Sequence, residues 1–411
     1  MPPQCRFCKA VLEETFVDLG QSPLANSFLD PAHLDRPEPR FPLHVYVCGQ
    51  CFLVQLPEHE TPGEIFDNSY AYFSSFTESW LKHAQKYVDT MTGRLGLGPN
   101  HQVIEIASND GYLLQYFVQK QIPAFGIEPS ANVAAAAEEK GVATQVRFFG
   151  TETARDLAGQ GQQADLLLGN NVLAHVPDLN DFVRGLKIAL KPDGWITMEF
   201  PHLVRLMEEN QFDTIYHEHF SYFSFLAVDA VFKKHGLLIF DCDELPTHGG
   251  SLRIYAGHAE QPPQPESETI AGLKEREEQL GIKKLETYRR FHCKVEENKK
   301  SVLKFLHQAK QEGKRVAGYG APAKGNTLLN YCGVGTDLIE YTVDRSPHKQ
   351  GKLLPGTHIP VYAPEKLMAT RPDYIVILPW NIKDELMNQL SGTREWGAQL
   401  VTFIPDVQVH P

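Results

Sequence analysis

Short apolar runs alternate with helical segments along the chain from His101 onward. The runs, together with the helical stretches that follow most of them, are QVIEIASNDGYLLQYF, AFGIEPSANVAAAAEEKG, ADLLLGNNVLAHV and GWITMEF. This alternation predicts an α/β fold in which helices cover a parallel sheet, with ligands at the carboxyl ends of the strands. A later segment, LLIFDCDELPTHGGSLRIYAGH, predicts two strands joined by a Gly-containing turn. Those strands would add an antiparallel edge to the sheet.

The pattern changes over residues 261–312, where a Pro-rich break precedes a charged amphipathic stretch. Its apolar residues recur mostly at spacings of three or four, so we expect one helix face to pack on a neighbouring domain. These apolar residues are Leu280, Ile282, Leu285, Tyr288, Phe291 and Val295. Beyond them, strands are expected in RVAGYGAPAKG, IEYTVDRS, YIVILPWN and LVTFIPD.

Composition and charge exclude several classes of protein. The 411 residues are enough for two or three domains, and 42% hydrophobic with 22% charged residues is typical of a globular protein. No apolar run approaches the roughly eighteen residues of a membrane span, and the N-terminus does not resemble a secretory signal. We therefore expect a cytoplasmic protein. The net charge of −12, without a basic patch, argues against nucleic acid as a partner.

Four of the seven cysteines form two pairs, Cys5-x-x-Cys8 and Cys48-x-x-Cys51. A two-residue spacer lets both thiolates of a pair point at one ion, which suits the tetrahedral sulfur coordination of zinc. Because all four ligands would come from the protein, the ion would serve folding and leave no position for a substrate. Redox thiols or unliganded core cysteines are the alternatives. The isolated cysteines are expected to be small buried residues; they are Cys242, Cys293 and Cys332.

A small polar turn follows the first strand of the α/β region. It comprises Ala107, Ser108, Asn109, Asp110 and Gly111 and lacks the G-x-G-x-x-G pattern that seats a pyrophosphate. Glu128 ends the second strand, where a carboxylate accepts hydrogen bonds from a ribose. Polar side chains at Glu105, Asp110, Asn170 and Asn171 could instead seat a sulfonium and its carboxylate. These features resemble the class I S-adenosylmethionine-dependent methyltransferases.

The loop after RVAGY offers a rival interpretation. Gly318-x-Gly320-x-x-Ala323 fits a dinucleotide fingerprint, and Asp344 stands near the position of a ribose-binding acidic residue. An NAD-dependent oxidoreductase would use such a loop. Against this alternative, Lys324 follows on the same loop and no Tyr-x-x-x-Lys set accompanies it.

Six motifs together give a more specific resemblance. The four-cysteine module, EIASNDGYLL, NNVLAHVPD, IYHEHFSYFS, THGGSLR and GYGAPAKGNTLLN occur in this order in the sugar C-methyltransferase family. That family acts on nucleotide-linked keto-deoxysugars. The resemblance implies S-adenosylmethionine and structural Zn²⁺ as cofactors, a dTDP- or GDP-linked sugar as substrate, and a monomer or weak dimer. It implies a class I methyltransferase sheet with an N-terminal zinc-binding module and a second, C-terminal Rossmann-like domain. The expected domains are 1–66 (zinc), 67–260 (methyltransferase), 261–312 (helical connector) and 313–411 (Rossmann-like).

The stretch DTIYHEHFSYFS carries the candidate base. A C–H bond has no lone pair, so carbon methylation needs an enolate, and therefore a base and donors to the enolate oxygen. Histidine has an unperturbed pKa near neutrality. We predict His219 as the base, with Glu218 orienting an imidazole or binding a sugar hydroxyl or amine, and Tyr216 nearby. By similarity these three match the family's active site, but the residues alone leave His217 open as the base.

The resemblance also assigns a tyrosine and a histidine to the site. The tyrosine is placed at Tyr70, with Tyr72 as the alternative, and the histidine is His175. Further candidates for substrate contacts are Tyr72, His217, Tyr222, Glu199, His202, His248, Ser251, Arg253 and Lys324. His83 stands without a polar cluster and is expected to be an ordinary surface or core residue. The remaining alternatives are a catalytic metal or a solvated turn at YHEH, an O- or N-methyltransferase, and a non-catalytic binding protein.

Overall fold

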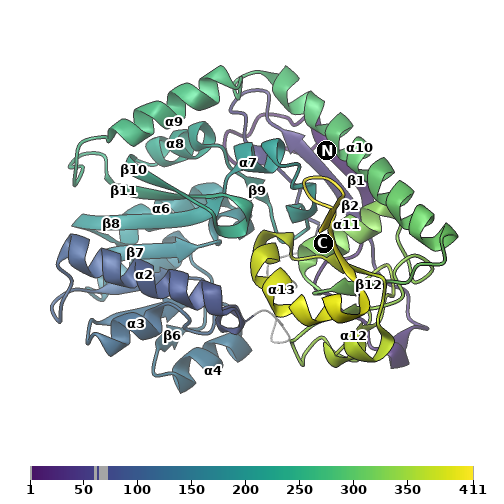
Figure 1. Ribbon diagram of the computed structural model, residues 1–411. Coiled ribbons are helices and arrows are strands. Elements are labelled where there is room, and N and C mark those ends of the chain that lie inside the picture. Colours follow the sequence, from purple (N-terminus) through teal and green to yellow (C-terminus); the bar gives the residue numbers. More distant parts are fainter. Residues whose placement is uncertain (1, 60–62, 64–72, 411) are drawn as a thin grey trace.

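The computed structural model describes residues 2–59, 63 and 73–410, which form three β-sheets and the helices around them (Figure 1). In this part of the chain no helix is both long enough and apolar enough to cross a membrane. Tyr70 and Tyr72 lie outside the described residues. The short 3-10 helices are η1 (Pro31–His33), η2 (Ser74–Phe76), η3 (Leu173–His175), η4 (Phe212–Thr214), η5 (Thr247–Gly249), η6 (Trp380–Ile382) and η7 (Ser391–Trp396).

The central sheet has seven strands in the order β10-β11-β8-β7-β4-β5-β6. Strands β8, β7, β4, β5 and β6 are parallel, whereas β10 and β11 form the antiparallel edge. The strands are β4 (Val103–Ile106), β5 (Ala124–Ile127), β6 (Ala143–Gln145), β7 (Ala164–Asn170), β8 (Leu190–Pro201), β10 (Leu237–Leu245) and β11 (Ser251–His258). The predicted sheet, with its antiparallel hairpin, is confirmed.

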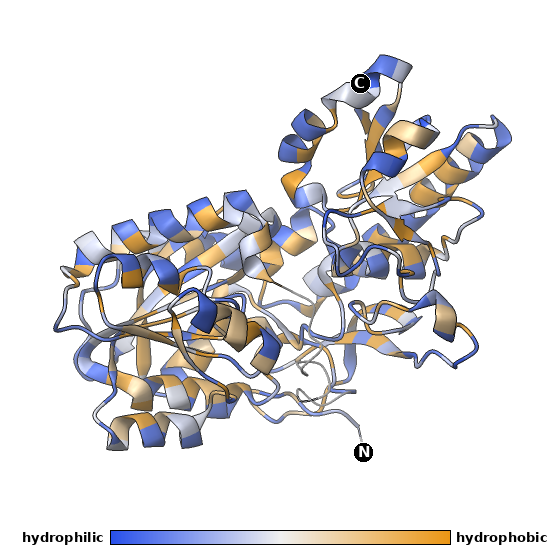
Figure 2. Ribbon diagram, turned by 90° about the horizontal axis from the view of Figure 1, so that it is seen from below, coloured by the Kyte–Doolittle hydropathy of each residue, from blue (hydrophilic) through white to orange (hydrophobic). Residues whose placement is uncertain are grey.

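Helices cover both faces of this sheet because successive strand residues point to opposite sides. Ile104 and Ile106 of β4 pack on one face, and Val103 packs on the other. The first face is covered by α5 (Thr151–Gly159), α6 (Leu179–Ala189), α8 (Phe225–Lys234) and α9 (Glu268–Gln279). The second is covered by α2 (Glu78–Leu95), α3 (Leu114–Gln119) and α4 (Ala131–Glu139). Figure 2 shows strands rich in hydrophobic residues between helices that carry both hydrophobic and hydrophilic residues.

The N-terminal sheet has four strands in the order β1-β2-β3-β9. Three come from the cysteine module: β1 (Glu14–Ser22), β2 (Phe41–Val47) and β3 (Val54–Gln55). The fourth, β9 (Ser221–Tyr222), comes directly after the YHEH turn and pairs antiparallel with β3. A short helix, α7 (Leu203–Glu208), precedes that turn. The cysteine module and the candidate catalytic segment are therefore parts of one sheet, an arrangement that the sequence pattern did not reveal.

The C-terminal domain is a second Rossmann-like sheet in the order β14-β13-β12-β15-β16-β17, parallel except for β17. Its strands are β12 (Val316–Tyr319), β13 (Thr342–Val343), β14 (Val361–Tyr362), β15 (Tyr374–Ile377), β16 (Gln399–Thr402) and β17 (Gln408–His410). Its helices are α11 (Ala323–Cys332), α12 (Glu365–Thr370) and α13 (Lys383–Gln389). This domain confirms the expected C-terminal fold.

The connector forms α9 and the long helix α10 (Leu285–Gln311), which run along one edge of the molecule (Figure 1). Phe291 of α10 stacks on Phe16 of β1, with ring centroids 4.6 Å apart. The apolar face of α10 thereby joins the N-terminal sheet to the C-terminal domain in one core. Leu280 is an exception to the predicted face: it ends α9 and is 40% exposed, because the chain turns there before α10 begins.

Candidate active site

The four paired cysteines converge at the N-terminus. Their Sγ atoms all lie within 4.8 Å of one another; Cys5 and Cys51 are 3.6 Å apart, and Cys8 and Cys48 are 3.4 Å apart. With Zn–S bonds of about 2.3 Å, tetrahedral ligands stand just under 4 Å apart, so the four thiols fit one zinc ion. Of the other cysteines, Cys242 and Cys332 are buried as expected, but Cys293 is exposed because it lies on the solvent side of α10.

The turn after β4 is held by Glu128 from the end of β5. One Glu128 oxygen accepts from the backbone N–H of Asn109 at 3.0 Å and the other from that of Ser130 at 2.9 Å. Asn109 itself has a positive φ of 49°. A Cβ on Gly126 of β5 would stand 2.0 Å from Ser108 Oγ, so glycine is needed for this strand to lie so close to the turn. The predicted cofactor-binding turn therefore exists as a tight loop at the carboxyl edge of the parallel strands.

The polar side chains around this turn are engaged in different ways. Asp110 Oδ2 accepts from Lys140 Nζ at 2.9 Å and from Ser75, so neighbouring segments engage this oxygen, whereas Oδ1 is buried without a hydrogen-bond partner among the described residues. Glu105 is fully buried, and burial raises its pKa well above the usual value. At the end of β7, Asn170 Nδ2 lies 3.3 Å from the hydroxyl of Tyr112. Adjacent to it, Asn171 Nδ2 lies 3.4 Å from His248 Nε2.

His219 stands at the end of a tight turn in which its N–H donates to the carbonyl of Tyr216 at 2.9 Å. Its ring Nδ1 lies 2.9 Å from the carbonyl oxygen of Thr214. A carbonyl only accepts, so the neutral imidazole carries its hydrogen on Nδ1 and its lone pair on Nε2. Burial, followed by the neighbouring His175, lowers the pKa of His219 well below its usual value. The ring is therefore a neutral acceptor at neutral pH.

Two predicted partners surround His219. The ring of Tyr216 lies 4.0 Å from it and that of His175 lies 4.7 Å away, both measured between centroids. His175 comes from η3, directly after β7, and burial lowers its pKa to about 4. The structure therefore assembles three of the predicted catalytic side chains from two segments of the chain.

His217 and Glu218 contact the N-terminal module instead of the ring of His219. His217 is buried against the rings of Phe41 and His59, whose centroids are 5.9 and 6.3 Å away, and burial lowers its pKa to about 4. Glu218 Oε1 accepts a hydrogen bond from Nδ2 of Asn26 in the N-terminal module, at 2.5 Å. The turn thus separates the two histidines, and His219 is the one that lies beside His175.

Glu199, at the end of β8, is the centre of a buried network. Its carboxylate interacts with His83 Nε2 at 2.9 and 3.1 Å, with Arg253 Nη2 at 2.5 Å, and with Thr247 Oγ1 at 2.8 Å. Burial alone would raise the pKa of Glu199, but the hydrogen bond with His83 and the charge of Arg253 lower it to about 2. His83 is therefore not the ordinary residue expected from its sequence context, and the ring of Trp80 stacks on it at 4.9 Å.

Replacing Glu199 with glutamine is expected to destabilise the fold by about 3 kcal/mol at pH 7. A folded-state pKa near 2, against an unperturbed 4.5, stabilises the fold above pH 4.5, and this contribution is lost as the pH falls from 4.5 toward 2. Urea unfolding of wild type and Glu199→Gln between pH 3 and 7 measures it. A stability difference between the two proteins that stays constant across this range would contradict the lowered pKa of Glu199.

Two candidates for substrate contacts do not join these groups. His202 Nε2 lies 2.7 Å from the buried Glu277, whose carboxylate also accepts from the first backbone N–H groups of α8. Ser251 Oγ donates to the carbonyl of Thr247. These surroundings indicate structural roles for His202 and Ser251. Tyr222 of β9 is buried as well, but its ring lies 6.2 Å from that of His219, measured between centroids, so it does join the candidate site.

Lys324, at the start of α11, lies at the junction of the C-terminal domain with the YHEH segment. Its Nζ donates to Asn381 Oδ1 at 2.7 Å and lies 4.8 Å from the ring centroid of Trp380. Trp380 in turn donates to Asp213 at 2.7 Å. Burial lowers the pKa of Lys324 to about 8 and raises that of Asp213 to about 6. Sequence reasoning missed Trp380 and Asp213, whose contact joins two distant segments.

Neighbouring protein groups contact the dinucleotide-like loop where a dinucleotide would bind. Asp344 accepts from the backbone N–H groups of Ala321 and Ser346, both at 2.8 Å. A Cβ on Gly320 would meet Pro379 at 2.6 Å. Asn326 is 1% exposed and donates to the carbonyl of Ala25. The acidic side chain expected to face a ribose therefore binds backbone instead.

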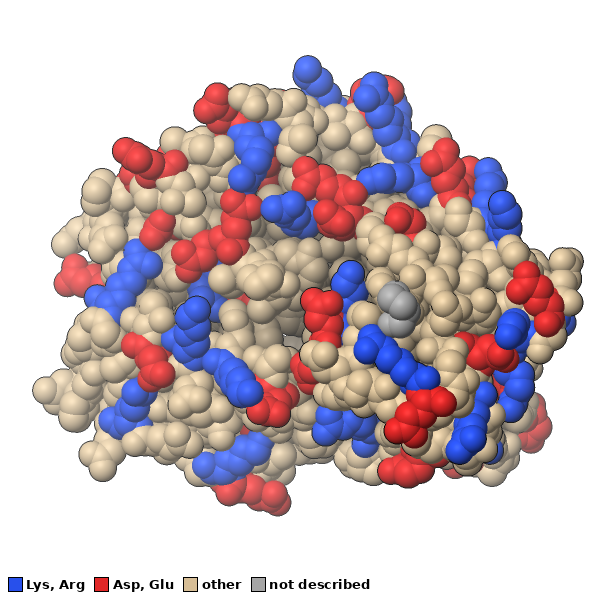
Figure 3. All heavy atoms as spheres, in the orientation of Figure 1, with Lys and Arg blue, Asp and Glu red and all other residues tan. Residues whose placement is uncertain are grey.

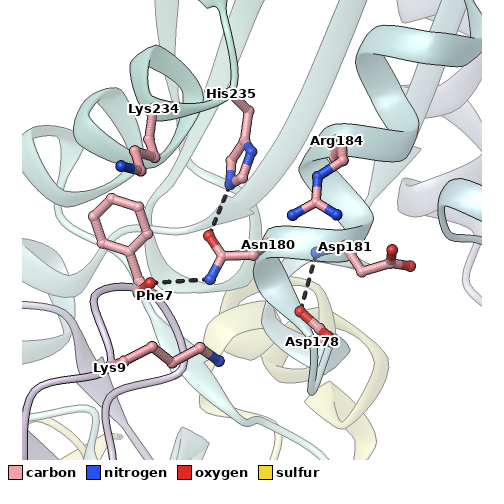
Figure 4. Close-up of a pocket in the computed structure, with 8 residues that line it drawn as sticks. All are labelled: Phe7, Lys9, Asp178, Asn180, Asp181, Arg184, Lys234 and His235. Atoms are coloured by element: carbon pink, nitrogen blue, oxygen red, sulfur yellow. Dashed lines mark hydrogen bonds between the residues drawn. The ribbon is translucent and has the colours of Figure 1, made fainter.

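The surface is hollowed between the methyltransferase half and the C-terminal half, and charges of both signs stand on the rim (Figure 3). A different groove, of about 350 Å³, lies between the first cysteine turn, α6 and the end of α8 (Figure 4). It is lined by Phe7, Lys9, Asp178, Asn180, Asp181, Arg184, Lys234 and His235. None of the candidate catalytic side chains lines this groove.

Comparison with known families accounts for nearly the whole chain. A zinc binding domain matches residues 5–66, a methyltransferase domain matches residues 80–240, and a C-methyltransferase C-terminal domain matches residues 246–405. The C-methyltransferase NovU of Streptomyces niveus is 36% identical over 406 residues, which cover 99% of this chain and 96% of that protein. The chain belongs to the C-methyltransferase family. The dinucleotide-like loop thus lies in a C-methyltransferase domain, which removes the basis of the oxidoreductase alternative.

Solved structures of methyltransferases are similar to part of this C-methyltransferase. An S-adenosylmethionine-dependent methyltransferase from Clostridium acetobutylicum is 12% identical, with a TM-score of 0.36, over 43% of this chain and 92% of that chain. Magnesium protoporphyrin IX methyltransferase from Synechocystis, with bound S-adenosylmethionine, is 16% identical, with a TM-score of 0.33, over 44% and 81%.

The family assignment settles the enzyme class and the cofactors. This C-methyltransferase is an S-adenosylmethionine-dependent enzyme with a class I methyltransferase core and an N-terminal zinc-binding domain. The residues present fit both groups. The four convergent thiols suit zinc, and the tight turn after β4, with Glu128 behind it, leaves backbone and small side chains where a nucleoside cofactor approaches the sheet.

Proposed function

We propose that the enzyme methylates a carbon next to the ketone of a nucleotide-diphospho-deoxysugar, by way of an enolate. The observation that carries this proposal is the hydrogen bond from His219 Nδ1 to Thr214, which leaves Nε2 as a proton acceptor. Carbon methylation requires such a base, whereas methylation of an amine or a hydroxyl has a lone pair on the acceptor atom from the start. The name of the relative, a C-methyltransferase, agrees with this chemistry.

In the proposed reaction, His219 Nε2 takes the proton from the carbon next to the ketone, and the electron pair of the C–H bond moves to the carbonyl oxygen. S-adenosylmethionine, when bound, supplies an electrophilic methyl group, and its C–S bond breaks as the enolate carbon attacks. Tyr216 lies within reach of the same region and donates a hydrogen bond to the enolate oxygen, while the neutral ring of His175 packs beside the base. Tyr70, assigned by resemblance, would add a further donor. His219 then returns its proton to solvent.

Other residues are proposed to hold the two ligands. The turn from Ala107 to Gly111, with Glu128 and the Asn170-Asn171 pair, would hold the cofactor. For the sugar, we retain Glu218, whose carboxylate would accept a hydrogen bond from a hydroxyl or amine. The additional candidates for sugar or phosphate contacts are Glu199, His248, Arg253 and Lys324, and Lys324 supplies a cation beside Trp380. The nucleotide is proposed to be dTDP or GDP, bound in the hollow between the two halves.

A panel experiment tests this function. Labelled S-adenosylmethionine is incubated with dTDP- and GDP-linked keto-deoxysugars and with the corresponding sugars that carry a hydroxyl in place of the ketone, and the methylated position is located by NMR. We expect a new C–CH₃ group on the keto sugars alone. Solvent deuterium should also enter that carbon without the methyl donor, because the base acts before transfer. A product methylated on oxygen or nitrogen would instead favour an O- or N-methyltransferase.

We further propose that the protein works in the cytoplasm as a monomer or weak dimer. A reducing compartment keeps the four thiols available for zinc, whereas an oxidising one would favour disulfides between cysteines this close together.

A further inference from the structure

A side chain of the zinc-binding module reaches the proposed active site. Asn26 lies in the loop between β1 and η1, far from the four cysteines in the chain, and its Nδ2 donates to Glu218 Oε1. The two residues are 192 positions apart. Glu218 is 5% exposed, so the direction of its carboxylate is set by the groups around it rather than by solvent.

Helix α11 of the C-terminal domain holds both sides of this contact. Asn326 Nδ2 donates to the carbonyl of Ala25, the residue before Asn26, at 2.6 Å. The next residue, Thr327, donates to the carbonyl of Ile215, directly before the YHEH turn, at 2.9 Å. Both α11 side chains are at least 98% buried. Adjacent residues of one helix thus set the separation between the Asn26 loop and the catalytic turn.

The Asn26 loop is also fixed at its far end. Leu29 exchanges two backbone hydrogen bonds with Leu353 of the C-terminal domain, at 3.0 and 2.9 Å. An amide on such a braced loop directs a carboxylate without bringing a charge of its own. A Lys or Arg in its place would form an ion pair with Glu218 and compete with any polar group of a substrate.

We propose that Asn26 is a positioning residue for methyl transfer, which acts by orienting Glu218, and that Asn326 and Thr327 form the clamp that places it. The GYGAPAKGNTLLN motif, which contains Asn326 and Thr327, would then align the N-terminal module with the catalytic turn. The inference rests on the proposed function in one respect: Glu218 faces the sugar. It assigns the zinc-binding module a direct part in the reaction, beyond folding.

Kinetics of Asn26→Ala test the proposal, with the exposed neighbour Ser27→Ala as the matched control. We expect kcat/KM to fall by about tenfold or more in Asn26→Ala, because a misdirected group near the reacting carbon is costly. Zinc content and affinity for S-adenosylmethionine should equal those of Ser27→Ala. In a Glu218→Ala background, Asn26→Ala should have no further effect, since the two act as a unit. Two results would overturn the proposal. One is a double variant in which the losses of Asn26→Ala and Glu218→Ala multiply, and the other is an equal rate in Asn26→Ala and Ser27→Ala.

A second measurement does not need the sugar. The ring signals of His175 and His219 are followed by NMR in protein with ¹⁵N-labelled histidine and assigned with His175→Gln and His219→Gln. We expect them to shift in Asn26→Ala and to stay in place in Ser27→Ala, because the His175 ring is hydrogen-bonded to the backbone of Glu218. Unchanged signals refute the positioning role. If wild type is inactive on every keto sugar, the proposed function fails, while the histidine spectra still decide the role of Asn26.

Discussion

His219→Gln is expected to lower the rate of C-methylation by about 10² to 10⁴-fold while leaving the binding of S-adenosylmethionine intact. Glutamine has a similar reach and can still donate to the carbonyl of Thr214, but it cannot accept a proton as imidazole Nε2 does. The loss should therefore appear in kcat and in the exchange of solvent deuterium into the sugar. Calorimetric titration with S-adenosylmethionine checks that the cofactor site is unchanged.

The pH dependence of the same step follows from the direction of the pKa shift. Burial lowers the pKa of His219 below 6.5, so the ring becomes a neutral base at a lower pH than free histidine does. The rate should rise with pH through that lowered pKa and be level across neutral pH. A rate that instead falls as the pH rises from 5 to 7 would mean that protonated histidine is the active form.

His217→Gln is the comparison that separates the two histidines. His217 lies against Phe41 and His59 rather than beside His175. We therefore expect the reduction in rate to be about tenfold smaller in His217→Gln than in His219→Gln. A larger loss in His217→Gln would transfer the role of base to His217.

Cys48→Ser should abolish stoichiometric zinc and unfold the N-terminal module. Structural zinc sites contribute apparent free energies of about 10 to 16 kcal/mol in small zinc domains, and three thiolates hold the ion far less tightly than four. The damage should also reach the active site. Val54 and Gln55, just beyond the second cysteine pair, pair with β9, and Gln55 Nε2 lies 3.2 Å from Cys5 Sγ.

Metal analysis and activity on the same samples measure this effect, with the exposed Cys293→Ser as the control. Cys293 lies on α10, away from the zinc ligands, and its variant should keep one zinc ion and full activity. Retention of zinc and of activity in Cys48→Ser would show that the cluster does not hold the fold together.

Local patterns were enough to predict the main architecture. In β4 three of the four residues, Val103, Ile104 and Ile106, are apolar, and such a short apolar run between helical segments predicts a strand covered on both faces before any contact is known. The cysteine pairs predicted zinc because a two-residue spacer brings two thiolates to one ion wherever the turn lies. Leu280 shows the limit: its spacing fits the apolar face, but the chain turns there and leaves it exposed.

The order of domains, the cysteine cluster and the polar turn of the methyltransferase core could all be predicted from sequence patterns, because each of these depends on residues close together in the chain. Three contacts emerge only in the folded protein: β9 completes the sheet of the zinc module, His83 joins the Glu199 network, and Asn26 binds Glu218. Such contacts join segments that are far apart in sequence. Their geometry depends on how whole layers pack, and neither periodicity nor spacing carries that information.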